Sequence, residues 1–532
     1  NPNVDLLKGE GAVVIFGDAK DELILRKAKV HNAKYIVTLT DSDSTNMEIV
    51  STLITMQKDM ANQIACYIHL IHNEFYEFFM AQDFQNSTKL DIKIFNVNSN
   101  SARMLFGDKN NLLGSNILTS TKAIKDPNTK VKIAIFGFGE LGESILLHAL
   151  HLGHFYNETP IEVTVVYDED KDENANLLDE FTKQYNIGID KNKKTNTSFE
   201  EYWKIRFIDD GEFEKENISE YSQIVIAYED EFESLSNLMK MLKKYNDEIL
   251  SNNIDISIYS NSFVSTASVI KNDKKKDKEG NLQETIFKQV RTFGEIKETC
   301  SYAMIIDQQL DEKSKLNNEY YNKLHGHYNS LPTKELEQYQ NELYNANMEF
   351  SDVIKKVATK AKDNNIEIVD YSGWNNLSMF LKDSNRYLME HHNIKKYIID
   401  KFIDESLKEY DYETTKNNIK SKYFYKHQKI NWDEMGLKDH EYAVKLSEDE
   451  IVQLGKVEHN RWVAFHILNG WKKRDIPTGT KDKIEKDKVR KLHPCIVSWD
   501  ELDRVSKNHN HDYKSDDIET IMRIPSLEKI MK

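Results

Sequence analysis

One segment constrains the fold of this 532-residue chain more than any other. Residues 131–136 form a short apolar run, and Gly137-Phe138-Gly139-Glu140-Leu141-Gly142 follows it and opens a helix-forming stretch at residues 143–152. After a strand, the first glycine permits a tight turn, the second lets the backbone approach a phosphate, and the third lets the helix pack closely. The N-terminus of such a helix offers unpaired N–H groups to an anion. The pattern therefore predicts a phosphate-binding loop.

The residues after this loop predict a parallel α/β sheet. Short apolar runs at residues 161–167, 203–208, 223–228 and 254–259 alternate with helix-forming stretches, which favours right-handed crossovers between parallel strands. Asp168 ends the first run, where an acid accepts hydrogen bonds from ribose hydroxyls. We therefore predict a Rossmann-type unit over residues 126–310.

The cofactor expected in this unit is NAD(H) or another adenine nucleotide, although the same fold also serves as an unoccupied dimerisation scaffold. The residues predicted to contact the cofactor are Gly137, Gly139, Glu140, Leu141, Gly142, Asp168 and Asp209.

Residues 1–125 have a similar but incomplete pattern. Apolar runs at residues 12–16, 35–39 and 64–71, with a weaker one at 91–97, predict strands that alternate with helices. We expect half of an α/β unit here. The chain opens at Asn1, close to the first expected strand, so we also expect upstream sequence, which could include the membrane helices of a channel.

Composition argues against some classes of function. The net charge is −16 and 30% of the residues are charged. Proteins that bind nucleic acid without sequence preference need a positively charged surface, so this composition argues against that class. The three cysteines fit neither a disulfide framework nor a CxxC metal site, so a reducing cytoplasm is the simpler location. No apolar stretch reaches the roughly 18–20 residues that span a bilayer. A charged run at residues 271–280 indicates a solvated loop.

The strand pattern fades after residue 310. Residues 311–365 are polar and predict a helical connector, and residues 366–532 contain five of the six tryptophans. Ser447 and Glu450 form a capping box, which predicts the start of a helix of about twenty residues. Gly470 is a suitable residue to end that helix.

This predicted helix carries Glu458, Arg461, Trp462 and Phe465 at i, i+3, i+4 and i+7, so their side chains share a face. His459 lies on a neighbouring face. An acid, a guanidinium and an indole on one surface can bind a planar polar ligand by stacking and paired hydrogen bonds. They can equally form an internal ion pair beside a core tryptophan, and the residues alone favour this second interpretation.

Residues 17–50 resemble the second half of the TrkA-N, or RCK, domains that regulate potassium channels and transporters. In that family a Gly-Asp pair ends the third strand and a Thr/Asp-rich loop ends the fourth. The resemblance implies that Gly17, Asp18, Thr40 and Asp41 lie at the mouth of a nucleotide cleft. The chain departs from the family because a glycine fingerprint for this first unit is absent from it.

Residues 371–530 resemble prokaryotic RyR domains, relatives of the repeat found in ryanodine receptors. The resemblance is carried by Glu458-His459-Asn460-Arg461-Trp462, by Gly470-Trp471, by residues 491–502 and by Ser384-Asn385-Arg386. It implies a ligand-recognition module for nucleotide-derived signals. The residues expected to bind the ligand are Trp374, Asn385, Arg386, Glu458, His459, Arg461, Trp462, Trp471 and His493.

Together these features predict two Rossmann-like α/β units, a helical connector and a mainly helical RyR-like domain at residues 366–532. We expect a cytoplasmic, homo-oligomeric module, most simply a dimer, that binds a nucleotide-type ligand and controls an ion channel or transporter, with potassium as the expected ion. A soluble stress or defence effector that responds to a second messenger is a variant of this hypothesis.

Two enzymatic alternatives are an NAD-dependent oxidoreductase and a nucleotide-processing enzyme. Neither is favoured, because the sequence has no HExxH, CxxC, nucleophile elbow or P-loop. No acid/base constellation follows the second Rossmann-like unit either. We therefore expect a binding protein and not an enzyme.

Overall fold

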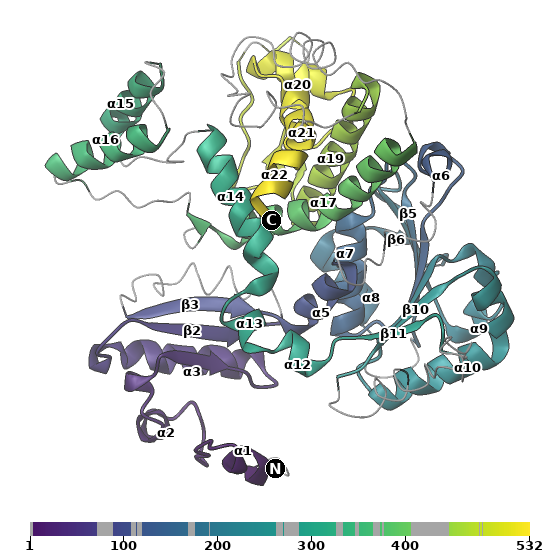
Figure 1. Ribbon diagram of the computed structural model, residues 1–532, viewed down its shortest axis with the longest axis horizontal. Helices are drawn as coiled ribbons and strands as arrows, with labels where there is room; N and C mark the ends of the chain where they lie inside the picture. Colours follow the sequence, from purple (N-terminus) through teal and green to yellow (C-terminus); the bar gives the residue numbers. More distant parts are fainter. Residues whose placement is uncertain are drawn as a thin grey trace. The chain divides into compact units, whose positions relative to one another are not determined.

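The computed structural model describes residues 4–71, 89–107, 113, 120–168, 176–190, 192–261, 270, 287–325, 333–345, 350–364, 366, 373–374, 377–405, 446–477, 479–480 and 482–531. They form two compact units (Figure 1). The first unit consists of residues 1–102 and 294–309, and the second of residues 103–293 and 310–532.

The first unit contains a parallel sheet in the order β1–β2–β3. Its strands are β1 (Tyr35–Thr38), β2 (Ile64–His69) and β3 (Leu90–Phe95), so the strands predicted at residues 35–39, 64–71 and 91–97 are confirmed. Val50 and Leu53 of α3 pack on the apolar side chains of β2. The described helices of this unit are α1 (Val4–Gly9), α2 (Glu22–Lys27), α3 (Asp43–Thr55), α12 (Ile296–Thr299), α13 (Tyr302–Ile305) and the first turns of α5 (Val97–Phe106).

The strand predicted at residues 12–16 is wrong. These residues have no regular structure, and the side chains of Val13 and Phe16 are 87% and 75% exposed. A run of β-branched and aromatic residues forms a strand only beside another strand, because β propensity reflects packing on a pleated surface. Among the described residues, the first sheet consists of β1, β2 and β3 alone, and none of them pairs with this run.

The described strands of the second unit form one sheet in the order β11–β10–β9–β4–β5–β8–β7–β6. β4, β5, β8, β9, β10 and β11 are parallel, and in chain order they are arranged 6-5-4-1-2-3, which is the Rossmann order. The predicted α/β fold class with Rossmann-like units is therefore confirmed. The strand bounds are β4 (Lys132–Phe136), β5 (Ile161–Val166), β6 (Ile189–Asp190), β7 (Thr195–Asn196), β8 (Trp203–Ile208), β9 (Gln223–Ile226), β10 (Asp255–Tyr259) and β11 (Val290–Phe293).

Helices cover this sheet, and β9 and β10 are buried along their whole length, while β4 and β5 each have one partly buried residue. Such continuous apolar strands are expected where helices lie on both faces of a parallel sheet. On one side, Ile224 and Ile226 of β9 share a cluster with Leu238 and Met241 of α10. The helices that follow the strands are α7 (Glu140–Leu152), α8 (Leu177–Tyr185), α9 (Asp210–Phe213) and α10 (Glu231–Ser251).

The rest of the second unit is mainly helical (Figure 1). α19 packs on α21, α14 packs on α17, and α7 of the Rossmann sheet packs on both α17 and α19. The helical region and the sheet therefore share a core. The described helices are α6 (Thr121–Lys125), α14 (Glu312–His325), α15 (Lys334–Asn345), α16 (Phe350–Asp363), α17 (Met379–Glu405), α19 (Glu448–Leu468), α20 (Leu502–His509), α21 (Tyr513–Met522) and α22 (Ile524–Met531), and the short strands are β12 (Lys472–Lys473) and β13 (Leu492–His493).

Both ends of α19 are as predicted. The hydroxyl of Ser447 accepts the Glu450 amide N–H, and the Glu450 carboxylate accepts the Ser447 amide N–H, which completes the capping box. At the other end Gly470 has a φ of +79°. The amide of Trp471 then donates to the carbonyl of His466, which gives the Schellman arrangement of a helix C-terminus.

Among the helices that the structure describes, none combines the length and the apolar character needed to span a bilayer. The division of the chain at residues 125, 310 and 365 stays a prediction. The charged run at residues 271–280 and Trp432 lie outside the described residues.

Candidate functional site

The glycine-rich loop after β4 has the geometry of a phosphate-binding turn. Gly137 has a φ of +94°, and a Cβ there would lie 3.0 Å from the backbone of Ala227. A Cβ on Gly142 would lie 2.1 Å from the carbonyl oxygen of Gly137, so only glycine lets α7 start this close to the strand. Gly139 is the N-cap of α7, and its missing side chain lets a ligand approach the helix N-terminus.

Carboxylates surround this loop. β9 and β5 lie on either side of β4, and β8 lies beyond β5. Glu229 follows β9, Asp168 follows β5 and Asp209 follows β8, and all three side chains are exposed. A Cβ on Gly139 would lie 2.8 Å from Oε1 of Glu229. Asp209 is also the N-cap of α9, where its side chain accepts the Glu212 amide at 2.7 Å.

The residues present fit NAD(H) or another adenine nucleotide in two respects. The glycines allow close approach of a pyrophosphate, and Asp168 follows the strand next to the loop, where a ribose would lie. Glu140 opens α7, and Leu141 is buried in the core. The Glu229 carboxylate opposes an anionic ligand, so we expect it to weaken the binding of phosphates.

In the first unit, Gly17 and Asp18 form a turn before α2. The Asp18 carboxylate accepts the Lys20 amide at 2.9 Å, and both Gly17 and Asp18 are exposed. This is a local structural role, and binding of a nucleotide there stays a prediction.

Thr40 and Asp41 follow β1 in the same unit. The Thr40 hydroxyl donates to Oδ1 of Asn46 at 2.9 Å, and Asp41 is exposed. Asn46 is buried, and its Nδ2 donates to the carbonyl of His69 at 3.0 Å. Asn46 therefore ties the loop after β1 to the end of β2, a role the sequence analysis missed because it depends on a contact 23 residues away.

Glu458 of α19 lies between two cations in the interior. Arg461 donates to it through Nε at 3.0 Å and through a terminal nitrogen at 2.7 Å, and Lys395 of α17 donates at 2.6 Å. Glu458, Arg461 and Lys395 are 3%, 2% and 1% exposed. Burial alone would raise the pKa of Glu458, but Arg461 and Lys395 outweigh it and hold that pKa well below its ordinary value. The internal ion-pair interpretation therefore applies to Glu458 and Arg461.

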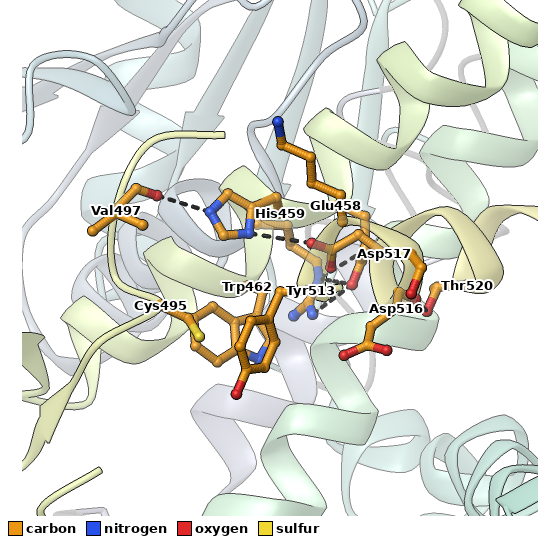
Figure 2. A network of polar contacts seen from close by, with 12 residues as sticks. Glu458, His459, Trp462, Cys495, Val497, Tyr513, Asp516, Asp517 and Thr520 are labelled. Carbon is orange, nitrogen blue, oxygen red and sulfur yellow. Dashed lines mark hydrogen bonds and ion pairs between the residues drawn. The ribbon is translucent and has the colours of Figure 1, made fainter. Parts of the chain in front are cut away.

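His459 joins α19 to two other segments, as Figure 2 shows. Its Nε2 lies 2.8 Å from the carbonyl of Val497, which can only accept, so Nε2 carries a proton. Its Nδ1 lies 3.2 Å from the carboxylate of Asp517 on α21. Burial raises the pKa of Asp517 to about 6, although His459 counteracts it. These two contacts of His459 fix α21 and the Val497 segment against α19.

Trp374, Asn385 and Arg386 are held by neighbouring helices. Arg386 donates to Asp311 at 2.9 and 2.5 Å and to Asp383 at 2.8 Å, and its guanidinium lies 5.8 Å from the Trp374 ring. The side chain of Asn385 accepts from the Asn317 amide at 2.8 Å. Arg386 is thus committed to carboxylates of its own chain, and its predicted role in ligand binding stays a prediction.

The remaining predicted binding residues lie together. Trp462, Trp471 and His493 are half-buried and surround His466. The ring centre of His466 lies 3.8 Å from that of Trp462, 5.8 Å from that of Trp471 and 5.6 Å from that of His493. Phe380 of α17 packs 5.3 Å from the same imidazole. The structure therefore separates the predicted set, because Glu458 and Arg461 are internal and the indoles and His493 form a half-exposed aromatic cluster.

A histidine-rich seam connects α7 to α17 and α19. His151 stacks on Tyr387 with ring centres 3.8 Å apart and lies 5.9 Å from Phe465. His391 donates through Nε2 to the backbone carbonyl of His154 at 2.9 Å. Burial, followed by the charge of Arg461, lowers the pKa of His154 to about 3. These imidazoles are therefore neutral, and they are buried between the helix of the glycine loop and the C-terminal helices.

Comparison with known proteins identifies one domain. Residues 1–77 match the TrkA-N domain, a Rossmann-type nucleotide-binding regulatory domain. No curated protein matches the chain. The resemblance of the C-terminal part to RyR domains stays a prediction. Within the part of the chain that the structure describes, no group of three or more His, Cys, Asp or Glu side chains is arranged to hold a metal ion.

Replacing Glu458 tests the buried ion cluster. We expect Glu458→Gln to lower the free energy of unfolding by about 3–5 kcal/mol, because two buried cations lose their counter-charge. Asp400→Asn is the matched control, since Asp400 pairs with Lys396 on the exposed face of α17 and should cost about 0.5 kcal/mol or less. The free energy of unfolding of each variant is measured by denaturant titration, with tryptophan fluorescence as the signal. Equal stability of the two variants would contradict the interior role of Glu458.

The neutral seam predicts a loss of stability in acid. An unfolded histidine takes up a proton below its ordinary pKa of 6.5, whereas folded His154 does so only near pH 3, so stability falls as pH drops through this window. The loss is up to about 1.4 kcal/mol per pH unit for each such histidine. His154→Gln should therefore lose less stability between pH 7 and pH 5 than the wild-type protein.

His511→Gln is a control for which acid should change the free energy of unfolding in the opposite direction. Asp516 raises the pKa of His511, so this histidine stabilises the fold at low pH and the stabilisation is lost as pH rises through its folded pKa. The His511→Gln protein should therefore lose more stability than the wild type on acidification. Thermal unfolding midpoints at pH 7 and pH 5 distinguish the cases, and equal losses in all three proteins would refute the account of the seam.

Proposed function

We propose that this chain is the ligand-sensing part of a regulatory protein. A nucleotide-type ligand binds at the glycine-rich loop after β4, and its binding changes the arrangement of the C-terminal helices. The output is control of an ion channel or transporter, fused upstream or associated, with potassium as the ion. The TrkA-N match of residues 1–77 and the resemblance to RCK domains support this output.

The observation that carries the proposal is the path of α7. This helix begins at Gly139 and Glu140, where a phosphate would bind, and it ends in the seam with α17 and α19. His151 and His154 are buried there against Tyr387 and His391. Because packed cores switch between discrete arrangements, a small movement of α7 at the loop is transmitted to the C-terminal helices.

Regulation of this kind requires a difference in affinity. A ligand that binds both arrangements equally well shifts neither population, however tightly it binds. We propose that the ligand favours one packing of α7 against α17 and α19. A homodimer of the chain would pass this preference on to its effector.

The proposed activity is binding and not catalysis. Burial raises the pKa of the thiols of Cys66 and Cys495 to about 12, so both are protonated and poorly nucleophilic. The carboxylate of Glu458 is already bound by two cations and cannot serve as a free base. These commitments support a sensor.

The test is binding of NADH and ATP, measured by calorimetry and by thermal unfolding. At about 100 times its dissociation constant, a ligand should stabilise the wild-type protein by about 2.7 kcal/mol and be recovered unchanged. Gly139→Ala should weaken binding by about tenfold, because a Cβ fills the place of closest approach. Gly9→Ala is the matched control, since its Cβ would meet no atom within 4 Å.

Failure of both nucleotides to alter the unfolding curve, or equal affinities of the two glycine variants, would refute the site at the loop. Conversion of either nucleotide by the purified protein would refute the proposal of a sensor without catalysis.

A second variant tests the acidic surroundings of the loop. Glu229→Gln removes the carboxylate nearest to Gly139, so NADH and ATP should bind about fourfold more tightly, as expected for one unit charge about 5 Å away in water. The gain should shrink at high salt. Unchanged affinity would show that phosphates do not bind beside Gly139.

A further inference from the structure

We propose that the histidine-rich seam holds internal water, bound where α7, α17 and α19 meet. The water accepts a hydrogen bond from Arg461 and donates hydrogen bonds to imidazole nitrogens of the seam. This site lies in the interior and is separate from the glycine-rich loop. Its existence does not depend on a nucleotide at that loop, so the two proposals can fail separately.

Four buried polar atoms of the seam have no hydrogen-bond partner in the part of the chain that the structure describes. They are Nη1 of Arg461, Nε2 of His151, Nε2 of His154 and Nδ1 of His391. In that order, the four residues are 2%, 5%, 5% and 0% exposed. Buried polar atoms normally have a partner, and ordered water supplies it where the protein does not. Four such atoms at one junction therefore indicate a bound polar molecule.

Contacts between the three helices bring these residues together (Figure 1). His391 of α17 donates through Nε2 to the His154 carbonyl at 2.9 Å, and the two ring centres lie 6.2 Å apart. Lys395 follows His391 by one turn of α17. It binds the same carboxylate as Arg461 of α19, that of Glu458. Arg461 is therefore tied to the face of α17 that carries His391.

His151 reaches the same junction from α7. Its ring lies 5.9 Å from that of Phe465, and Phe465 follows Arg461 by one turn of α19. Burial lowers the pKa of His154 to about 3, and the charge of Arg461 adds to this effect, as expected for a guanidinium close to the ring. These contacts place Arg461 among the imidazoles that lie between α7 and α17.

The three imidazoles present hydrogen-bond acceptors. Nδ1 of His151 lies 2.7 Å from the Leu147 carbonyl, which can only accept, so the lone pair of His151 is on Nε2. His154 is bonded to the Leu150 carbonyl, so its Nε2 is also an acceptor. His391 donates through Nε2, which leaves the lone pair on Nδ1. Burial lowers the pKa of all three rings, so each of them is neutral.

Water is the ligand that fits a donor beside three acceptors. Arg461 donates to Glu458 through Nε and Nη2, which leaves two N–H groups on Nη1. An anion would accept from Nη1 but would be repelled by the imidazole lone pairs, and a cation would be repelled by the guanidinium. A water molecule accepts from Nη1 and donates to two imidazoles, which matches the roughly three hydrogen bonds of a typical buried water.

Internal water would let the seam adjust without losing its hydrogen bonds. A water molecule is small and can turn, so it can bridge polar groups whose separation changes. Under the proposed function, α7 shifts against α17 and α19, and water keeps the imidazoles and Arg461 bonded during the shift. This role rests on the proposed function, whereas the site itself rests on the buried atoms alone.

A crystal structure of the whole chain at high resolution tests the site directly. We expect electron density for a water oxygen at about 2.7–3.2 Å from Nη1 of Arg461 and from at least one of the three imidazole nitrogens. Density for a bound anion at this place would overturn the proposal. So would ordered side chains with no density between them, or a direct hydrogen bond from Nη1 to a protein atom.

Substitution of histidine by phenylalanine tests the site in solution. His151→Phe and His154→Phe each remove one acceptor of the water. His466→Phe is the matched control, because His466 is 6% exposed and also bonds the carbonyl four residues earlier, that of Trp462. Unlike those of His151 and His154, its Nε2 is not a buried atom without a partner.

Unfolding of the three variants is compared at about pH 8, where an unfolded histidine is neutral as well. The folding equilibrium constants of His151→Phe and His154→Phe should be about threefold to tenfold lower than that of His466→Phe, because the internal water loses a partner. At a site without water, the apolar ring would instead remove an unsatisfied buried nitrogen. Seam variants as stable as the control, or more stable, would therefore overturn the proposal.

Discussion

Glu458 holds the positive charges of Lys395 and Arg461 in a place from which bulk water is excluded. Removing ions from water costs several kcal/mol for each, and this cost is offset only while all three groups keep their positions. The cluster therefore specifies how α17 and α19 meet. α7 packs on the same two helices, so the position of the glycine-rich loop depends on this arrangement as well.

We propose that this dependence lets the second unit act as a sensor. A phosphate at the start of α7 would act on helices that share one buried seam of neutral histidines. The rings of this seam are closely packed, with His151 stacked on Tyr387 at 3.8 Å, and closely packed interiors change between discrete arrangements. Under this proposal, binding energy at the loop selects one packing of the helices, and acid biases the same choice.

Local patterns predicted much of this structure, and non-local contacts account for the rest. The glycine loop and the capping box of α19 depend on residues within six positions of each other, and the structure has both the tight turn and the capped helix start. The strand predicted at residues 12–16 was wrong because pairing depends on a neighbouring strand. The burial of Glu458 and Arg461 depends on Lys395, 63 residues from Glu458 along the chain, and no spacing rule connects them.

Amide hydrogen exchange of the whole chain, with and without ATP or NADH, tests the central claim that ligand binding is coupled to the C-terminal helices through α7. The account predicts that a bound nucleotide slows exchange in the glycine-rich loop and α7 and also in α17 and α19. Slower exchange confined to the residues that contact the nucleotide, with α17 and α19 unchanged, would contradict it.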